Sequence, residues 1–264
     1  MNILQTVGAR SAFIFTAITL MVSLVLVQPA GAILNGIPDG NRHPNAGYIS
    51  LVNLSCSGVL ISPRYVATAA HCVQVAQDRG IVAADVYVNF AEDPAQSNTW
   101  YQAKSMSYDP KWLDTYAAGN SSANTPTNDY GVIELKKEVK GIAPANLPPL
   151  GYTTTLPTGT PILETVGYGT TGWDNNDNVI TFTRAYANLS LTNGNAKNTS
   201  KFLKVSGQHT GPCYGDSGGP TYEGNNTGTV LGIMSYVTSY NCSSWGFVGR
   251  LDIPDAHDFF APFD

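Results

Sequence analysis

The chain has 264 residues and a formal net charge of −5, and only 12% of its residues are charged. This small negative net charge gives no support for a nucleic-acid partner, because proteins that bind nucleic acids normally carry a basic patch or stripe. The 26 Gly and 16 Pro, with abundant Val, Ile, Thr and Tyr, favour an all-β protein built from short strands.

Residues 1–32 have the features of a secretory signal. Arg10 supplies the positive charge, residues 11–27 form an apolar run without a charge, and Ala30-Gly31-Ala32 matches a cleavage site. Cleavage after Ala32 makes Ile33 the first mature residue, whereas cleavage after Ala30 leaves a dipeptide in front of it. A retained membrane anchor is the competing interpretation, but the run is near the lower limit for spanning a bilayer. We therefore expect a secreted protein with no membrane attachment after signal removal.

The mature chain keeps four cysteines, an even number that predicts two disulfides in an exported protein. They are Cys56, Cys72, Cys213 and Cys242. Three pairings are possible, and the spacing alone does not choose among them. With all four paired, no His and Cys cluster is left for zinc, and Glu92 and Asp93 form only a weak candidate for a calcium loop. We expect neither a cofactor nor a metal.

A histidine follows the first strand-like runs of the mature chain. These runs lie at 49–54, 58–62 and 65–68, and a further one lies at 86–90. Small alanines before His71 permit tight packing around its imidazole. A lone histidine in a half-buried segment is more often structural than catalytic. His71 is nevertheless the candidate base, because the other three histidines have no comparable sequence surroundings: His43, His209 and His257.

An aspartate comes directly before the apolar run 132–135. A carboxylate at the start of a buried strand is poorly solvated and needs a partner, for which the Nδ1–H of a histidine is suited. Asp129 is therefore the candidate carboxylate, and an Asx turn before a strand is the alternative interpretation. Asp109 and Asp114, in a loop with Pro and Trp, are weaker candidates.

A serine bounded by glycines completes the set of candidate residues. Ser217 lies in the run Gly215-Asp216-Ser217-Gly218-Gly219-Pro220, where glycines let a reacting group approach the main chain closely. A polar surface turn has a similar composition and is the alternative. A serine hydroxyl is a weak nucleophile by itself, so this interpretation requires the histidine and the carboxylate.

These three segments occur in the order His, Asp, Ser, and the combination resembles the chymotrypsin/trypsin family of serine proteases. The resemblance implies an all-β fold of two six-stranded antiparallel Greek-key barrels, with the active site in the cleft between them and a short C-terminal helix at 255–260. The first barrel would span 33–145 and the second 146–264. Further strand-like runs fit the second barrel, at 162–167, 179–191, 201–205 and 229–237.

The resemblance also assigns roles to single residues. Ser217 is the nucleophile, His71 the base and Asp129 the residue that orients the base, while the amides of Gly215 and Ser217 form the oxyanion hole. Asp216 pairs with the α-amino group of Ile33. The implied disulfides are Cys56–Cys72 and Cys213–Cys242. Most relatives expose the activating amine by cutting after a basic residue, but Ala32 is not basic, so we expect that export itself activates the enzyme.

The specificity pocket follows from the same resemblance. Gly211 stands where trypsin-like members carry an aspartate, so cleavage after Arg or Lys is not expected. Val237 would narrow the entrance and favour small or medium apolar side chains, with larger ones as the second choice. The pocket is expected to contain Gly211, Pro212, Tyr214, Ser235, Tyr236, Val237 and Gly246. The expected partners of a monomer are polypeptide substrates and protein protease inhibitors. An inactive homologue that acts as a binding protein is the alternative.

Overall fold

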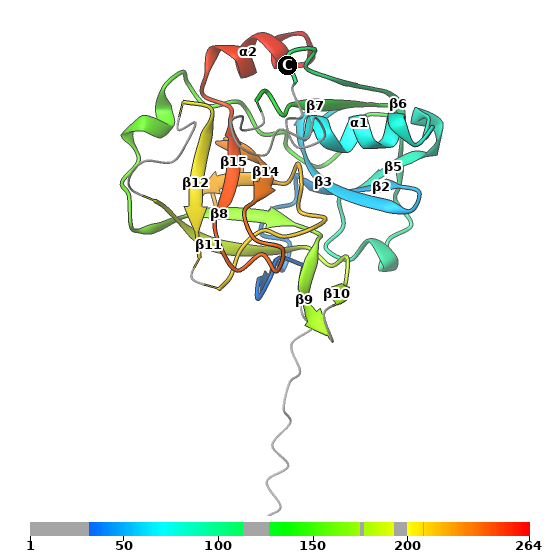
Figure 1. Ribbon diagram of the computed structural model, residues 1–264. Helices are drawn as coiled ribbons and strands as arrows, with labels where there is room; N and C mark the ends of the chain where they lie inside the picture. The colour runs from blue at the N-terminus through cyan, green and yellow to red at the C-terminus, as the bar shows by residue number, and fades with distance from the viewer. Residues whose placement is uncertain (1–31, 113–126, 175–176, 193–199, 208) are drawn as a thin grey trace, which may run out of the picture.

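The computed structural model describes residues 32–112, 127–174, 177–192, 200–207 and 209–264 (Figure 1). The expected signal sequence therefore lies outside the described residues, apart from Ala32. Among the described residues, no helix is long and apolar enough to cross a membrane.

Six antiparallel strands close the first barrel in the order β2-β3-β4-β7-β6-β5. Their bounds are β2 (Ala46–Leu51), β3 (Leu54–Ser62), β4 (Tyr65–Thr68), β5 (Val86–Asn89), β6 (Tyr101–Tyr108) and β7 (Gly131–Leu135). Apolar side chains such as Leu60, Val88 and Ile133 fill this barrel and are fully buried or nearly so. The helix α1 (Ala70–Asp78) follows β4 and covers part of the same core.

A second set of six antiparallel strands closes in the order β8-β11-β12-β15-β14-β13, since β13 pairs again with β8. These strands are β8 (Pro161–Gly167), β11 (Ala185–Leu191), β12 (Phe202–Ser206), β13 (Pro220–Glu223), β14 (Gly232–Val237) and β15 (Gly246–Arg250). A separate hairpin is formed by β9 (Thr170–Asp174) and β10 (Asp177–Ile180). The two barrels confirm the expected all-β architecture (Figure 1).

The two ends of the described chain tie the barrels together. Near the N-terminus, β1 (Ile37–Pro38) pairs with β11 of the second barrel. The C-terminal helix α2 (Pro254–Phe260) buries Phe260 beside Tyr130, which precedes the first barrel's β7. Four short 3-10 turns complete the elements, at Ala83–Asp85, Pro94–Gln96, Tyr152–Thr155 and Ala261–Phe263.

The passage from one barrel to the other lies close to the expected boundary. The amide of Ala145 donates to the carbonyl of Leu60 in the first barrel, and the amide of Asn146 donates to the carbonyl of Gly228. Gly228 follows β13 of the second barrel. The division of the mature chain at residue 145 stays a prediction, and these contacts support it.

Two features of the fold differ from the periodicity of the sequence. The run 179–191 reads as one alternating strand, but it is divided between β10 and β11, and Phe182 between them has a positive φ of 57°. A left-handed residue ends strand pairing, and a local alternation pattern does not reveal it. The helix α1 was also not expected, because its run Ala70–Asp78 is short and half-buried.

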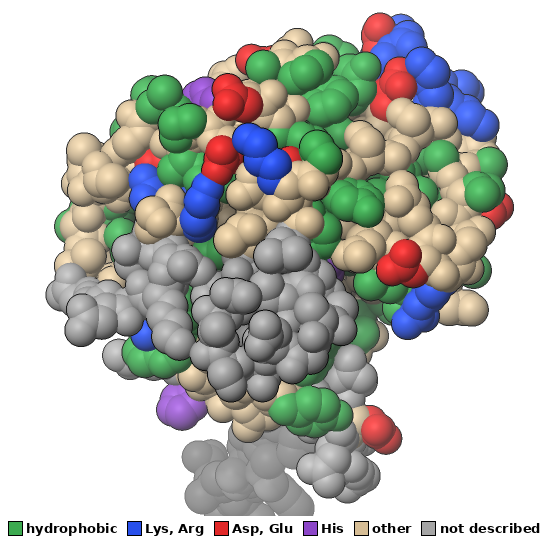
Figure 2. Space-filling view, turned by 45° about the horizontal axis from the view of Figure 1, so that its top comes forward, with side chains coloured by type: hydrophobic (Ala, Val, Ile, Leu, Met, Phe, Trp, Pro, Cys, Tyr) green, Lys and Arg blue, Asp and Glu red, His purple; other side chains and the backbone are tan. Residues whose placement is uncertain are grey.

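On the face shown in Figure 2, charged side chains are sparse among the described residues, and some of the Lys and Arg side chains lie next to Asp or Glu. Several of these neighbours are exposed ion pairs, for example Lys104 with Glu134 and Arg64 with Glu138. Most of the remaining ionic contacts involve side chains inside the molecule.

Candidate active site

Two adjacent strands bring the candidate histidine and aspartate together. His71 lies in the first turn of α1, which starts directly after β4, and Asp129 lies just before β7. In the pairing of β4 with β7, Thr68 is opposite Gly131, so the ends of the two segments meet. His71 Nδ1 is 2.9 Å from Asp129 Oδ2, and the amide of His71 donates to Asp129 Oδ1 at 2.9 Å.

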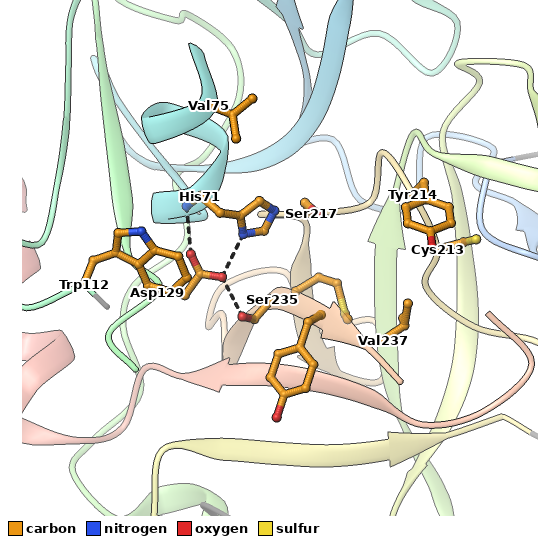
Figure 3. Close-up of a pocket in the computed structure, with 11 residues that line it drawn as sticks. His71, Val75, Trp112, Asp129, Cys213, Tyr214, Ser217, Ser235 and Val237 are labelled. Atoms are coloured by element: carbon orange, nitrogen blue, oxygen red, sulfur yellow. Dashed lines mark hydrogen bonds and ion pairs between the residues drawn. The ribbon is translucent and has the colours of Figure 1, made fainter. Parts of the chain in front are cut away.

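This arrangement defines the chemistry of the imidazole. Because the ionised carboxylate only accepts hydrogen bonds, Nδ1 of His71 carries the proton and Nε2 keeps a lone pair. Nε2 points toward Ser217 (Figure 3). The side chain of Asp129 is only 1% exposed, whereas that of His71 is 28% exposed. The pair is therefore a buried acceptor that orients an accessible base.

A serine from the second barrel also contacts Asp129. Ser235 Oγ donates to Asp129 Oδ2 at 2.5 Å from strand β14, so the carboxylate is held from both barrels. Ser235 was expected only as a pocket residue, and its bond to Asp129 was not predicted. The only local signal is a polar residue inside an apolar strand.

The weaker carboxylate candidates do not reach the histidine in the described structure. Asp109 is buried, and it accepts hydrogen bonds from Asn128 Nδ2 and from the amide of Lys111. It therefore holds the turn in which Asn128 has a φ of 54° and leads into Asp129. Asp114 lies outside the described residues.

Ser217 faces a cavity of about 400 Å³ beside the histidine (Figure 3). The cavity lies between residues of both barrels. Its lining consists of His71, Val75, Trp112, Asp129, Cys213, Tyr214, Ser217, Met234, Ser235, Tyr236 and Val237. The structure thus brings all three candidate catalytic residues to one hollow.

Two backbone amides next to the serine are left without a protein acceptor among the described residues: those of Gly215 and Ser217. The neighbouring amides are used, because Asp216 donates to the carbonyl of Cys213, Gly218 to that of Met234 and Gly219 to that of Asp216. Both residues are partly exposed beside the nucleophile, so their amides can bind an oxygen of a substrate.

The direction of these amides follows from the planar peptide bond. The carbonyl of Tyr214 accepts from the amide of Thr170 at 2.8 Å, and the carbonyl of Asp216 accepts from that of Gly219 at 2.9 Å. In a trans peptide the next N–H points the opposite way, away from those donors. Gly215 has a φ of 93°, and a Cβ there would lie 2.8 Å from Gly169 Cα, so a glycine is required.

Asp216 turns away from the cavity into the second barrel, where it is completely buried. Its carboxylate accepts from the amides of Gly169 and Cys213, each at 2.8 Å. Burial raises the pKa of Asp216 to about 7, and these two amides only partly oppose that effect. While Ala32 is still joined to Ile33, no positively charged group among the described residues contacts Asp216.

The segment that begins at Ile33 packs near Asp216. Ile33 is fully buried in the same apolar cluster as Tyr168, the residue before Gly169. Leu34 forms a bridge with Gly211, two residues before Cys213. Both contacts lie beside the donors that hold Asp216.

The expected pocket residues divide into two groups. Tyr214, Ser235, Tyr236 and Val237 line the cavity. The others are not in its lining: Gly211 is buried in its bridge to Leu34, and the Pro212 ring packs so closely on Gly246 that a Cβ there would be 2.9 Å from its Cγ.

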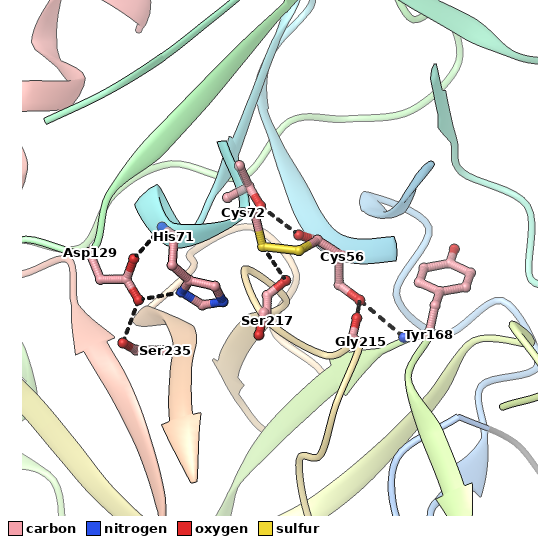
Figure 4. The surroundings of a disulfide bond; sticks show 10 residues. Cys56, His71, Cys72, Asp129, Tyr168, Gly215, Ser217 and Ser235 are labelled. Carbon is pink, nitrogen blue, oxygen red and sulfur yellow. Dashed lines mark hydrogen bonds and ion pairs between the residues drawn. A yellow bond between two sulfur atoms is a disulfide. The ribbon is translucent and has the colours of Figure 1, made fainter. Parts of the chain in front are cut away.

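Two disulfides brace the site. Cys56–Cys72 joins β3 to α1 next to His71 (Figure 4), and Cys213–Cys242 joins the serine loop to the segment after β14. This is the pairing that the resemblance implied. Of the calcium candidates, Glu92 accepts from the amide of Gly40 and Asp93 from that of Ala95. No metal-binding group of three or more His, Cys, Asp or Glu occurs across the described ranges.

Comparisons with known proteins agree with this geometry. A family model described as Trypsin matches residues 38–251. CLIP domain-containing serine protease B14 of Anopheles gambiae is 26% identical over 233 residues, which cover 77% of this chain and 60% of that protein. Chymotrypsin-like elastase family member 3B of Homo sapiens is 27% identical over 201 residues, covering 72% and 70%.

Solved structures share the fold at lower identity. Human heparin binding protein has a TM-score of 0.64 at 19% identity, with 89% of this chain and 96% of that chain covered. HL collagenase has a TM-score of 0.64 at 19% identity, covering 88% and 98%. The scabies mite inactivated protease paralogue S-D1 has a TM-score of 0.65 at 19% identity, covering 87% and 96%.

Proposed function

The chain belongs to the trypsin family, and we propose that it is a secreted serine endopeptidase acting through His71, Asp129 and Ser217. The observation that carries this proposal is the convergence of three groups at one cavity: an oriented imidazole, a serine beside it and two unpaired amides. Each of these groups has a defined part in acyl transfer.

In the first step, Ser217 Oγ attacks the carbonyl carbon of the scissile peptide while His71 Nε2 takes its proton. Asp129 stabilises the resulting imidazolium and keeps Nδ1 protonated. The imidazolium then gives its proton to the leaving amine, which departs as the acyl-enzyme forms. Water repeats the sequence, with His71 as base again, and releases the acid. Neither step requires a metal or cofactor.

The negative charge of the tetrahedral intermediate falls on the former carbonyl oxygen. The free amides of Gly215 and Ser217 would donate to it, and their direction is set by bonded neighbours, so little reorganisation is needed. Loss of one such donor typically costs roughly 100- to 1,000-fold in rate.

Asp216 is the proposed partner of the α-amino group of Ile33. A buried carboxylate whose pKa is raised to about 7 favours a cation next to it, and Ile33 already packs in the adjacent cluster. The paired amine would have a pKa above its usual value of about 8. The pair would then form while Asp216 is ionised and the amine is protonated, and it would be lost as pH rises through the raised pKa of the amine.

We infer that signal cleavage after Ala32 creates this amine directly. Protein that begins at Ile33 should be active, while protein that begins with Met before Ile33 should be inactive. Equal activity of the two forms would contradict the activating pair. Cleavage after Ala30 would instead appear in mass analysis of the secreted protein as two extra residues.

The preferred residue before the scissile bond is proposed to be small or medium and apolar. Val237 lines the cavity, and position 211 carries a glycine in place of an acid. A panel of peptides that differ only in this residue would test the preference. A preference for Arg or Lys would contradict it.

A fluorophosphonate probe tests the function itself, because it labels only an activated serine. We expect wild-type protein to be labelled at Ser217 and to cleave peptides, with Ser217→Ala as the negative control. A wild-type protein that folds and begins at Ile33 but stays unlabelled would favour the alternative function, an inactive binding homologue.

A further inference from the structure

One arginine is completely buried where the two barrels and the N-terminal segment meet. Arg184 comes directly before β11, and its side chain has no exposed surface. Its Nε donates to Asp39 Oδ2 at 2.8 Å, and one terminal nitrogen donates to Asn41 Oδ1 at 3.0 Å. The other terminal nitrogen donates to the carbonyl of Phe90 in the first barrel at 2.8 Å. Every part of the guanidinium is therefore engaged.

The same terminal nitrogen donates to the hydroxyl of Tyr168 at 3.0 Å. Tyr168 is also fully buried, and its hydroxyl lies 2.8 Å from the carbonyl of Ala91, to which it donates. Burial raises the pKa of Tyr168 to about 12, so the hydroxyl keeps its proton at neutral pH. The ring is thus held at its far end by a fixed charge and a fixed acceptor.

Tyr168 opens a three-residue turn, and each residue of the turn holds a part of the loop 214–216. The amide of Tyr168 donates to Ser57 Oγ, which donates to the carbonyl of Gly215 at 3.0 Å. The amide of Gly169 donates to the carboxylate of Asp216. The amide and the hydroxyl of Thr170 both donate to the carbonyl of Tyr214. This turn therefore sets the peptide planes of the candidate oxyanion hole.

We propose that Arg184 is a positioning residue for the oxyanion hole, which it aligns through the hydroxyl of Tyr168 and the turn 168–170. The inference rests on the proposed function, since it concerns the same site. Among the described residues, the Arg184 side chain bonds none of those that line the cavity, and the link to the loop 214–216 runs through Tyr168. Because Asp39 and Asn41 belong to the segment that begins at Ile33, docking of this segment reaches the loop by a second path, without the amine of Ile33.

Tyr168→Phe removes the hydrogen bond between Arg184 and the Tyr168 hydroxyl and leaves the other contacts of Arg184 in place. The variant keeps the ring, and Arg184 keeps its bonds to Asp39, Asn41 and Phe90. The matched control is Tyr222→Phe, because Tyr222 is equally buried nearby and its hydroxyl donates to Asn45 Oδ1, away from the turn. Both variants lose one buried hydroxyl, so they are expected to lose similar stability.

Steady-state kinetics and a peptide aldehyde provide the readout. Ser217 Oγ attacks the carbonyl carbon of the aldehyde while His71 takes the hydroxyl proton. The oxygen of the resulting adduct occupies the oxyanion hole. For Tyr168→Phe we expect kcat to fall about 10-fold with KM within twofold, less than the roughly 100-fold of a lost donor. The inhibition constant of the aldehyde should rise by the same factor. Tyr222→Phe should leave both quantities within twofold of wild type.

Two kinetic outcomes would overturn the proposal: unchanged kcat and aldehyde binding in Tyr168→Phe, or equal losses in the two variants. Amide exchange measured by NMR separates this inference from the proposed function. Whether or not the wild type is active, exchange of the Gly169, Thr170 and Asp216 amides should be faster in Tyr168→Phe and unchanged in Tyr222→Phe. Unchanged exchange in Tyr168→Phe would show that the turn is held independently of Arg184.

Discussion

The molecule contains two histidines that face a carboxylate through Nδ1, and they differ in what meets the other nitrogen. His71 Nδ1 is 2.9 Å from Asp129, and its Nε2 points toward Ser217 at the cavity. His43 Nδ1 is 2.5 Å from Asp39, and its Nε2 is 2.9 Å from Glu164 Oε2. In the first pair the second nitrogen faces the cavity beside Ser217, and in the second pair it faces another carboxylate.

The surroundings of the two pairs reinforce this difference. The ring of His43 has no exposed surface and stacks on Tyr222 with centroids 5.3 Å apart. Each of the two carboxylates that face His43 also pairs with an arginine: Glu164 with Arg42 and Asp39 with Arg184. The negative charges of these carboxylates are therefore compensated within the protein. His71 pairs with Asp129, and its side chain is 28% exposed. A histidine–carboxylate contact is therefore catalytic only where the second nitrogen can reach a reactant.

The strongest test of this comparison exchanges each histidine for glutamine. His71→Gln should lower kcat/KM by roughly 10,000-fold or more, because the base is lost while the fold remains. His43→Gln should keep kcat of the folded protein within a few-fold and lower its thermal stability instead. Peptide hydrolysis and thermal unfolding of both variants check this, and a catalytic loss in folded His43→Gln would remove the distinction.

The next largest effect is expected on stability, from Glu164→Gln. Glu164 has a side chain only 6% exposed and accepts two hydrogen bonds from Arg42, besides facing His43. Neutralising it weakens two charged hydrogen bonds from Arg42, which is itself 36% exposed and can stay hydrated, so we expect a loss of roughly 1.5–3 kcal/mol in the free energy of unfolding. Denaturant unfolding would measure the loss. A variant as stable as wild type would show that the buried cluster does not depend on this charge.

A third test compares two buried aspartates: Asp39, which has an arginine beside it, and Asp216, which contacts only backbone amides. Burial by itself raises the pKa of Asp39, but the hydrogen bond from His43 and the charge of Arg184 outweigh it, so the net shift is downward. Asp216 has only amides, and its pKa is raised to about 7. In protein that retains Ala32, the free energy of unfolding should therefore fall as pH rises from about 4 to about 7.

Cleavage between Ala32 and Ile33 should remove this fall in the free energy of unfolding, because the new α-amino group of Ile33 favours the ionised carboxylate of Asp216. Unfolding curves of the two forms across this pH range give the measurement, and Asp216→Asn in the uncleaved form is the control that should flatten the dependence. Parallel curves for the cleaved and uncleaved forms would argue against pairing of Ile33 with Asp216.

The smallest effect is expected at the surface, from Glu138→Gln. Glu138 is 50% exposed and lies 3.4 Å from Arg64, which is 46% exposed. Water screens such a pair, so its loss should change the free energy of unfolding by less than about 1 kcal/mol. The substitution removes the same charge as Glu164→Gln, but from a carboxylate that is exposed and whose contact with its arginine is longer. Similar losses in the two variants would contradict the role assigned to burial.

Much of the candidate site could be predicted from local sequence, because its chemistry is carried by short runs. Ser217 between glycines, His71 after small residues and Asp129 before an apolar strand each need a particular backbone setting that local residues supply. The strand at 65–68 was placed correctly for the same reason. The break at Phe182 and the helix α1 were missed, since both depend on packing against distant segments.

The sequence by itself determined the reactive groups, the all-β class and the even number of cysteines, because these depend on residue type and local spacing. Only the tertiary structure decided which groups meet. It showed that His43 is enclosed by Asp39 and Glu164, that Ser235 supports Asp129 and that Arg184 joins both barrels to the N-terminal segment. These contacts join residues far apart in the chain, except for the short step from Asp39 to His43. Their strength comes from exclusion of water, which no local pattern records.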